Sequence, residues 1–224
     1  MASSNTFQGY LERYALLSLE KQDKLESLIG EHLHELDLDA GTIRFDTLQC
    51  PVQVIGTESD NTLTWLWAWA DEQAELPANL IQSAIELRGW GAEAGVPELM
   101  TPAVDLNGAD GHAISMIASE VCGASCYYRD GYEGGSVFFL VFDKTIDSQP
   151  SFSRQRLLVR LVDLFSRYDL THRNAVLSYL TAKGLSPAEQ RNTINCELES
   201  GERLIAEFDD AGNLIVVNGG PFEI

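Results

Sequence analysis

The sequence contains few cysteines, and their number and spacing limit the kinds of disulfide or metal site that the chain can form. Four cysteines, at positions 50, 122, 126 and 196 of 224 residues, are too few for a disulfide framework in a chain of this length. Cys122 and Cys126 form one close pair, but neither a second pair nor histidines at zinc-finger spacing accompany them. We therefore expect neither a structural metal site nor a cofactor.

Basic residues are also scarce. Lys and Arg number 15 against 34 Asp and Glu, which gives a formal net charge of −19. Residues 1–112 carry 19 acidic and 5 basic side chains, whereas residues 113–224 carry 15 and 10. Acidic surfaces repel phosphate backbones, which argues against nucleic-acid binding, and they attract basic partners. Solubility alone is the competing explanation for such a charge.

Long apolar runs are absent. No stretch approaches the roughly 18 apolar residues that span a bilayer. The N-terminal residues do not pair a basic segment with an apolar one, as a secretory signal does. We therefore expect a cytoplasmic protein without a membrane interaction.

The apolar pattern predicts an α+β fold with a mostly antiparallel sheet covered by helices. A long N-terminal helix is expected over residues 6–37, with a break at Gly30 as the alternative. Asp110 is expected to cap a helix over 111–121. Further helices are predicted over 77–93, 151–168 and 172–183. Strands are predicted over 42–46, 52–57, 62–70, 125–129 and 136–142, and a C-terminal meander over 193–199, 203–209 and 213–219. We expect a main domain over 1–168, with 169–224 either separate or packed into it.

Residues 63–70, LTWLWAWA, place three tryptophans at alternate positions. On a strand, Leu63, Trp65, Trp67 and Trp69 share one face, and the other face is also largely apolar. Because a row of large aromatic side chains packs well beneath helices, the pattern favours a core strand. A mixed arrangement, with one Trp lining a cleft, and an open stacking platform remain alternatives.

A second segment, CYYRDGYEGG over residues 126–135, is rich in Tyr and Arg, which interfaces favour. We expect it to meet the end of the Trp strand in a cleft. A rigid hairpin with locally satisfied hydroxyls is the alternative. The candidate binding residues are Trp69, Asp71, Tyr127, Tyr128, Arg129, Tyr132 and Glu133.

Signs of enzyme chemistry are weak. His112 and Cys126 could form a nucleophile–base pair only if the fold brought them together. The glycine-rich stretches NGADGH and YEGGS match neither the P-loop nor the dinucleotide fingerprint. We therefore expect a protein without catalytic residues.

The two aromatic segments together carry a resemblance. TWLWAWA, followed by a helix that starts at proline, and YYRxxYxGG resemble a family of uncharacterised bacterial proteins catalogued as a domain of unknown function. The resemblance covers about residues 5–145. In that family an Asn often follows WAWA, where this chain has Asp71. The resemblance implies a bacterial cytoplasmic protein with this α+β arrangement, and it implies no catalytic residue.

We therefore predict a non-enzymatic binding protein that engages a basic toxin or effector, as immunity proteins do. The first alternative is a small-molecule binding protein or enzyme with a cleft between the Trp strand and helix 77–93. The second is a structural subunit that uses the arginine-rich helix 151–168 as an interface.

Overall fold

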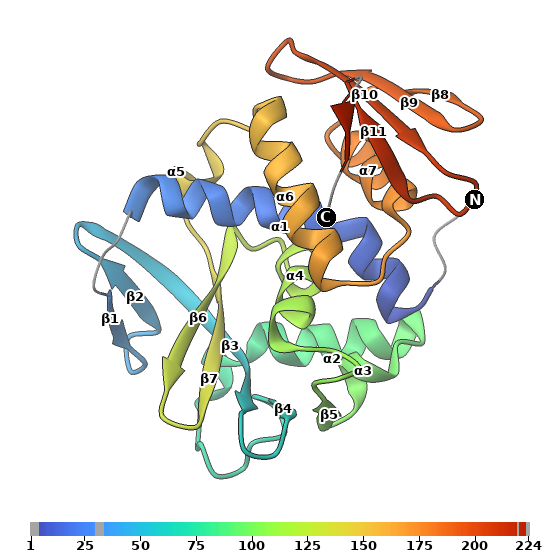
Figure 1. Cartoon of the computed structure of the whole chain (residues 1–224). Helices are drawn as coiled ribbons and strands as arrows, with labels where there is room; N and C mark the ends of the chain where they lie inside the picture. Colours follow the sequence, from blue (N-terminus) through green and yellow to red (C-terminus); the bar gives the residue numbers. More distant parts are fainter. Residues whose placement is uncertain (1–4, 30–33, 219, 223–224) are drawn as a thin grey trace. The chain divides into compact units, whose positions relative to one another are not determined.

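The α+β fold predicted from the sequence is confirmed by a computed structural model (Figure 1), which describes residues 5–29, 34–218 and 220–222. The chain divides into two compact units. Of the described residues, unit 1 holds 8–20 and those from 150 onward, and unit 2 holds 5–7 and those from 21 to 149. Helix α1 (Phe7–Ile29) supplies residues to both units. The expected division at residue 168 stays a prediction.

The predicted N-terminal helix over 6–37 is too long. Helix α1 ends at Ile29, residues 30–33 lie outside the described part, and His34–Asp37 form strand β1. Strand β1 pairs in antiparallel register with β2 (Thr42–Phe45) through a turn in which Gly41 has a φ of +65°. The spacing of the leucines fits a helix as well as a strand, and the turn residues decide for the strand.

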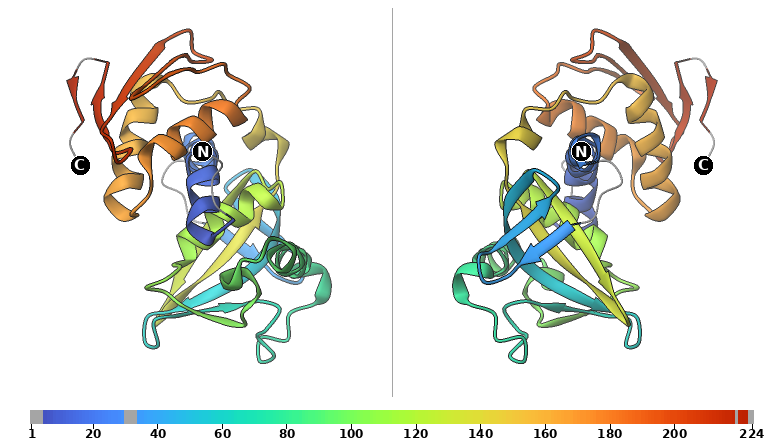
Figure 2. Two further views of the ribbon diagram at one scale, coloured as in Figure 1. Left: turned by 90° about the vertical axis from the view of Figure 1, so that its right-hand side faces the viewer. Right: turned by 90° about the vertical axis from the view of Figure 1, so that its left-hand side faces the viewer.

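Unit 2 is built on a seven-stranded antiparallel sheet that curls. Its further strands are β3 (Leu48–Ser59), β4 (Thr64–Trp67), β5 (Ala103–Asp105), β6 (Cys126–Tyr132) and β7 (Gly135–Val141). The order is β1-β2-β3-β4-β5, and β7 joins β3 to β6. The long strand β3 has an irregular register between Val54 and Gly56. Such bulges bend a strand, and the hairpin of β1 and β2 turns over β6 and β7 in Figure 2.

Helices cover one side of this sheet. They are the 3₁₀ turn η1 (Ala78–Leu80), α2 (Gln82–Ala94), α3 (Pro97–Met100) and α4 (Gly111–Val121). The short helix α5 (Lys144–Asp147) follows β7. The cap predicted for α4 is confirmed, since the Asp110 carboxylate accepts a hydrogen bond from Ala113 N at 2.7 Å. The helix predicted over 77–93 is interrupted at Ile81, and Pro77 precedes η1 as its N-cap.

Unit 1 packs α6 (Arg154–Arg167) and α7 (His172–Ala182) with a five-stranded antiparallel sheet. Its strands are β8 (Ala188–Gln190), β9 (Thr193–Glu197), β10 (Arg203–Phe208), β11 (Leu214–Val217) and β12 (Gly220–Pro221). The three longer strands were predicted. The short β8 and β12 were not, because neither is long enough to show an alternating pattern.

Candidate binding site

Two of the three clustered tryptophans are core residues. Trp65 and Trp67 have 0% of their surface exposed, which confirms the core interpretation for them. Trp65 packs edge-on against Phe138, and Trp67 Nε1 donates to Glu98 O at 3.1 Å. This face of β4 therefore packs on the side of α3 and leaves no open platform.

The ends of the Trp segment differ from the prediction. Leu63 has a φ of +51° and is 54% exposed, so it lies outside the strand face. The strand ends at Trp67, and Trp69 follows in a turn, half-buried and stacked on Trp67. The Arg88 guanidinium lies 4.2 Å from the Trp69 ring centroid. Trp69 Nε1 is buried without a hydrogen-bond partner among the described residues.

The Tyr and Arg segment forms β6, so its side chains alternate between two faces. On the helix side, Tyr127 Oη lies 3.0 Å from His112 Nδ1, and Arg129 pairs with Glu58. Tyr128 lies on the other face, where its hydroxyl is 3.0 Å from His34 Nδ1. Tyr132 is 55% exposed.

The remaining candidates lie apart from these. Glu133 is exposed in the turn between β6 and β7. Tyr132 pairs with Gly135, which lies opposite Ser59, and Ser59 in turn pairs with Thr64 at the start of β4. Trp69 follows the other end of β4, in the turn after Trp67. Tyr132 therefore lies at the opposite end of β4 from Trp69. Tyr128 pairs with Phe139, which pairs with Val54, so strands β7 and β3 separate β6 from β4. The binding roles of these residues stay predictions.

A side-chain clasp joins β1 to β6. His34 Nε2 lies 3.1 Å from Asp130 Oδ1, and His34 Nδ1 contacts the Tyr128 hydroxyl. The Tyr128 ring packs edge-on against Phe45. Burial, and then the negative charge of Asp130, raise the pKa of Tyr128, so this hydroxyl stays protonated near neutral pH. The clasp holds the hairpin of β1 and β2 across the curl of the sheet.

An apolar pocket lies within this curl. Its volume is about 270 Å³. Among the described residues that line the pocket, Asp71 alone has an ionisable side chain, and it is one of the predicted site residues. Leu66 and Ala68 line it from the β4 segment, on the face opposite Trp65 and Trp67. The other lining residues are Leu36, Leu38, Val54, Gly56, Thr57, Ala74, Leu76, Val137 and Phe139.

A second, open hollow of about 690 Å³ adjoins the first and shares Leu36 and Leu38 with it. Its acidic side chains are Glu35, Asp37 and Asp39. The sequence did not predict this acidic hollow, because residues 34–37 were expected to be helical. The alternation of His34, Leu36 and Leu38 was the signal that could have revealed it.

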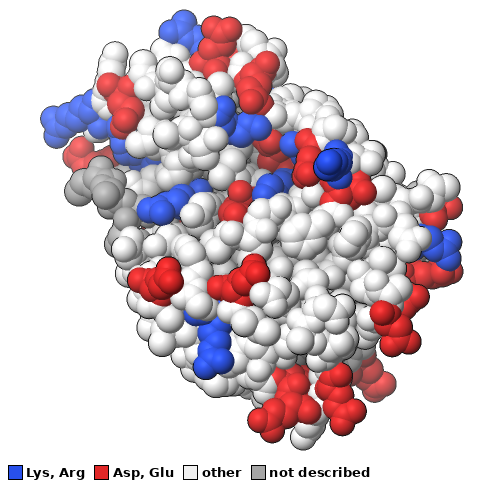
Figure 3. Space-filling model, turned by 180° about the vertical axis from the view of Figure 1, so that it is seen from behind, with Lys and Arg blue, Asp and Glu red and all other residues white. Residues whose placement is uncertain are grey.

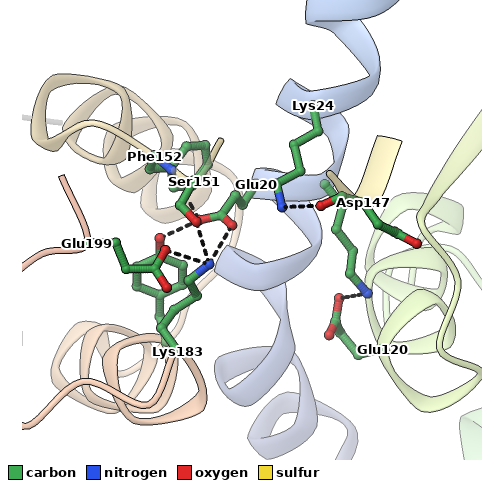
Figure 4. A network of polar contacts seen from close by, with 10 residues as sticks. Glu20, Lys24, Glu120, Asp147, Ser151, Phe152, Lys183 and Glu199 are labelled. Atoms are coloured by element: carbon green, nitrogen blue, oxygen red, sulfur yellow. Dashed lines mark hydrogen bonds and ion pairs between the residues drawn. The ribbon is translucent and has the colours of Figure 1, made fainter. Parts of the chain in front are cut away.

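Unit 1 contains a buried charged network, shown in Figure 4. Glu20 accepts hydrogen bonds from Tyr179 Oη at 2.5 Å and from Lys183 Nζ at 2.9 Å. Lys183 Nζ also lies 2.7 Å from Ser151 Oγ and 3.1 Å from a Glu199 oxygen. Burial lowers the pKa of Lys183, but Glu20 and then Glu199 outweigh it and raise the pKa. The lysine therefore stays cationic and does not act as a base toward Ser151.

The thiols lie in surroundings that keep them protonated. Burial, and then the charge of Asp143, raise the pKa of Cys50 to about 11, and burial together with Glu86 raises that of Cys122 to about 12. The pKa of Cys126 is raised further, mainly by burial. Because the thiolate is the nucleophile, Cys126 is unsuited to the pairing with His112. Among the described residues, no group of His, Cys, Asp and Glu side chains could hold a metal ion.

Most of the acidic excess belongs to unit 2. Residues 21–149 carry 22 acidic and 6 basic side chains, whereas residues 150–224 carry 10 and 8. In Figure 3, acidic side chains predominate in the lower part of the view. Within the described part of the chain, no helix is long and apolar enough to cross a membrane.

Comparison with known proteins relates the chain to a family. A family model described as a family of unknown function, DUF6882, matches residues 8–144. Neither the curated proteins nor the solved structures contain a match. The match covers almost all of unit 2 and both aromatic segments.

Proposed function

For this chain, which belongs to the DUF6882 family of unknown function, we propose that the function is to bind a positively charged protein without catalysing a reaction. The observation that carries the proposal is the charge of residues 21–149, which is −16. The family model covers residues 21–144 of that region, so nearly all of this charge lies in the matched part of the chain.

Several acidic side chains of unit 2 are exposed and form no hydrogen bonds or ion pairs with other described residues, so they are available to a partner. Glu72, Glu75 and Glu93 are exposed, and the structure gives them neither hydrogen bonds nor ion pairs. Free surface carboxylates create a field that steers a basic partner and raises its association rate. Antagonism of a basic toxin or effector in a bacterial cytoplasm is the form of binding that we propose.

The proposal is tested by affinity capture from the native host at low ionic strength, followed by reconstitution with the purified partner. We expect a basic protein that binds in a fixed stoichiometry and whose affinity falls as salt rises. Recovery of no basic partner, together with neighbouring genes that encode no toxin-like protein, would count against the proposal.

Matched charge variants sharpen the test. The triple variant Glu72→Gln, Glu75→Gln, Glu93→Gln removes three exposed carboxylates from unit 2. The control Glu197→Gln, Glu207→Gln, Asp210→Asn removes three exposed ones from unit 1. We expect the first to lower the association rate at low salt at least threefold more than the control. Equal effects would mean that overall charge, and not unit 2, attracts the partner.

A further inference from the structure

We infer that the apolar pocket and the acidic hollow beside it form one two-part docking site, which takes a basic segment of the partner protein with an apolar side chain at its centre. The inference rests on the proposed function, and it adds the place and the chemistry of recognition. Its evidence is the lining of the two hollows.

The apolar pocket determines the central side chain. Its walls are mainly leucine, valine and phenylalanine, and its volume is about 270 Å³. An apolar cavity of about 150 Å³ is large enough to bind benzene. A phenylalanine or leucine side chain therefore fits, and burying it removes apolar surface from water at about 25 cal/mol per Å².

The rim determines the charge of the flanking residues. Asp71 Oδ1 accepts hydrogen bonds from Gln73 N and Ala74 N, both at 3.1 Å, so this carboxylate is fixed at the pocket wall. Its other oxygen has no partner among the described residues. Glu72 and Glu75 belong to the same exposed loop. A lysine or arginine beside the buried side chain meets these carboxylates.

The shared leucines join the two hollows. Leu36 and Leu38 line both, whereas Glu35 and Asp37 alternate with Leu36 along β1 and face the other side of the hairpin. Because β1 is the last strand of the sheet order, a segment that fills the pocket reaches the acidic hollow by passing over the edge of β1. There Asp37 Oδ1 caps Ala40 N, and Glu35 pairs with Arg44, so Asp37 and Asp39 supply the negative charge that Arg44 does not offset. A neutral apolar ligand gains nothing from this second part, and charge complementarity therefore selects a basic protein segment.

The test uses three synthetic pentapeptides as probes: Lys-Lys-Phe-Lys-Lys, Lys-Lys-Ser-Lys-Lys and Gly-Gly-Phe-Gly-Gly. Binding to the full chain is followed by the methyl resonances of Leu36, Leu66 and Val137, which line the pocket. We expect the basic Phe peptide to bind at least tenfold more tightly than either of the others, and to shift these three resonances.

Two variants separate the parts of the site. Ala74 is exposed at the pocket wall, so Ala74→Trp plugs the pocket from a surface loop. We expect it to reduce the affinity of the basic Phe peptide to that of the Ser peptide. Asp37→Asn with Asp39→Asn should weaken the basic peptides at low salt. The control Glu93→Gln with Asp210→Asn, which changes the net charge equally, should not.

The outcomes distinguish this inference from the proposed function. If the basic Phe and Ser peptides bind equally and Ala74→Trp has no effect, the pocket is not the docking site, although acidic recognition of a basic protein stands. If neither basic peptide binds more tightly than the neutral one, the proposed function fails as well. If hexanol binds the pocket as tightly as the basic Phe peptide, the pocket is a small-molecule site and the inference is wrong.

Discussion

Gly56 has no room for a side chain. A Cβ atom there would lie 2.4 Å from Trp65 Cζ2 and 2.5 Å from Leu66 O, one of which is backbone and cannot rotate away. The Trp65 indole ring therefore lies directly against the Gly56 backbone, at the irregularity of β3. The close packing of the Trp row thus depends on a glycine in the neighbouring strand.

The substitution Gly56→Ala should destabilise unit 2 by about 1–3 kcal/mol, because overpacking forces the ring or the backbone to shift. The measurement is urea unfolding followed by Trp fluorescence. Gly89→Ala is the control, because Gly89 is exposed within α2 and a Cβ atom there meets nothing within 4 Å. That variant should gain up to about 1 kcal/mol from helix propensity. Equal stabilities of the two variants would contradict the packing argument.

At the scale of elements, His172 joins α7 to β11 and α6. Its ring stacks on Phe165 with centroids 3.6 Å apart, and its Nδ1 accepts a hydrogen bond from Leu214 N at 3.1 Å. Burial lowers the pKa of His172, and the charges of Asp209 and Asp169 only partly oppose this. An imidazole that accepts at Nδ1 is neutral, so protonation costs the contact with β11.

Stability should therefore depend on pH through this contact. The folded pKa is below the unfolded value of about 6.5, so the unfolded state binds the proton first as pH falls. The stability that neutral His172 contributes is fully present above about pH 6.5, and it is lost as the pH falls from there through the folded pKa. Thermal unfolding followed by circular dichroism at pH 7.5 and 5.5 should show a larger decrease for the wild type than for His172→Asn. Equal decreases would show that other groups control the response.

The elements also show how far the sequence determines the fold. The α+β class, the cap at Asp110 and the long strands of both sheets could be predicted, because local periodicity and capping chemistry encode them. The strand His34–Asp37 could not, because four residues fit two periodicities and pairing across the turn decides between them. The apolar pocket depends on that strand, so only its Asp71 was among the predicted site residues.

At the scale of the whole molecule, the acidic charge has an energetic effect besides steering a partner. Like charges on the compact unit 2 repel one another more than in the unfolded chain. All four tryptophans, at 65, 67, 69 and 90, lie in unit 2, so Trp fluorescence reports on that unit alone.

Added NaCl should therefore stabilise unit 2. Between about 10 mM and 0.5 M, screening shortens the Debye length from about 30 Å to a few ångströms, and the urea midpoint should rise. The measurement is Trp fluorescence in urea at several salt concentrations. The variant Glu72→Gln, Glu75→Gln, Glu93→Gln should show a smaller rise, because less repulsion remains to be screened. A midpoint that falls with salt would mean that attractive ion pairs dominate this unit.

The division of α1 between the units has a consequence for biosynthesis. Residues 8–20 leave the ribosome before residues 21–149 of unit 2, yet their packing partners in unit 1 begin at residue 150. At about 5–20 residues per second, they wait roughly 6–26 s for the start of that segment. Throughout that time the buried face of this helix, with Leu11, Leu16 and Glu20, has no partner from its own unit. Nascent chains of this protein should therefore depend on a chaperone that shields the first helix until translation is almost complete.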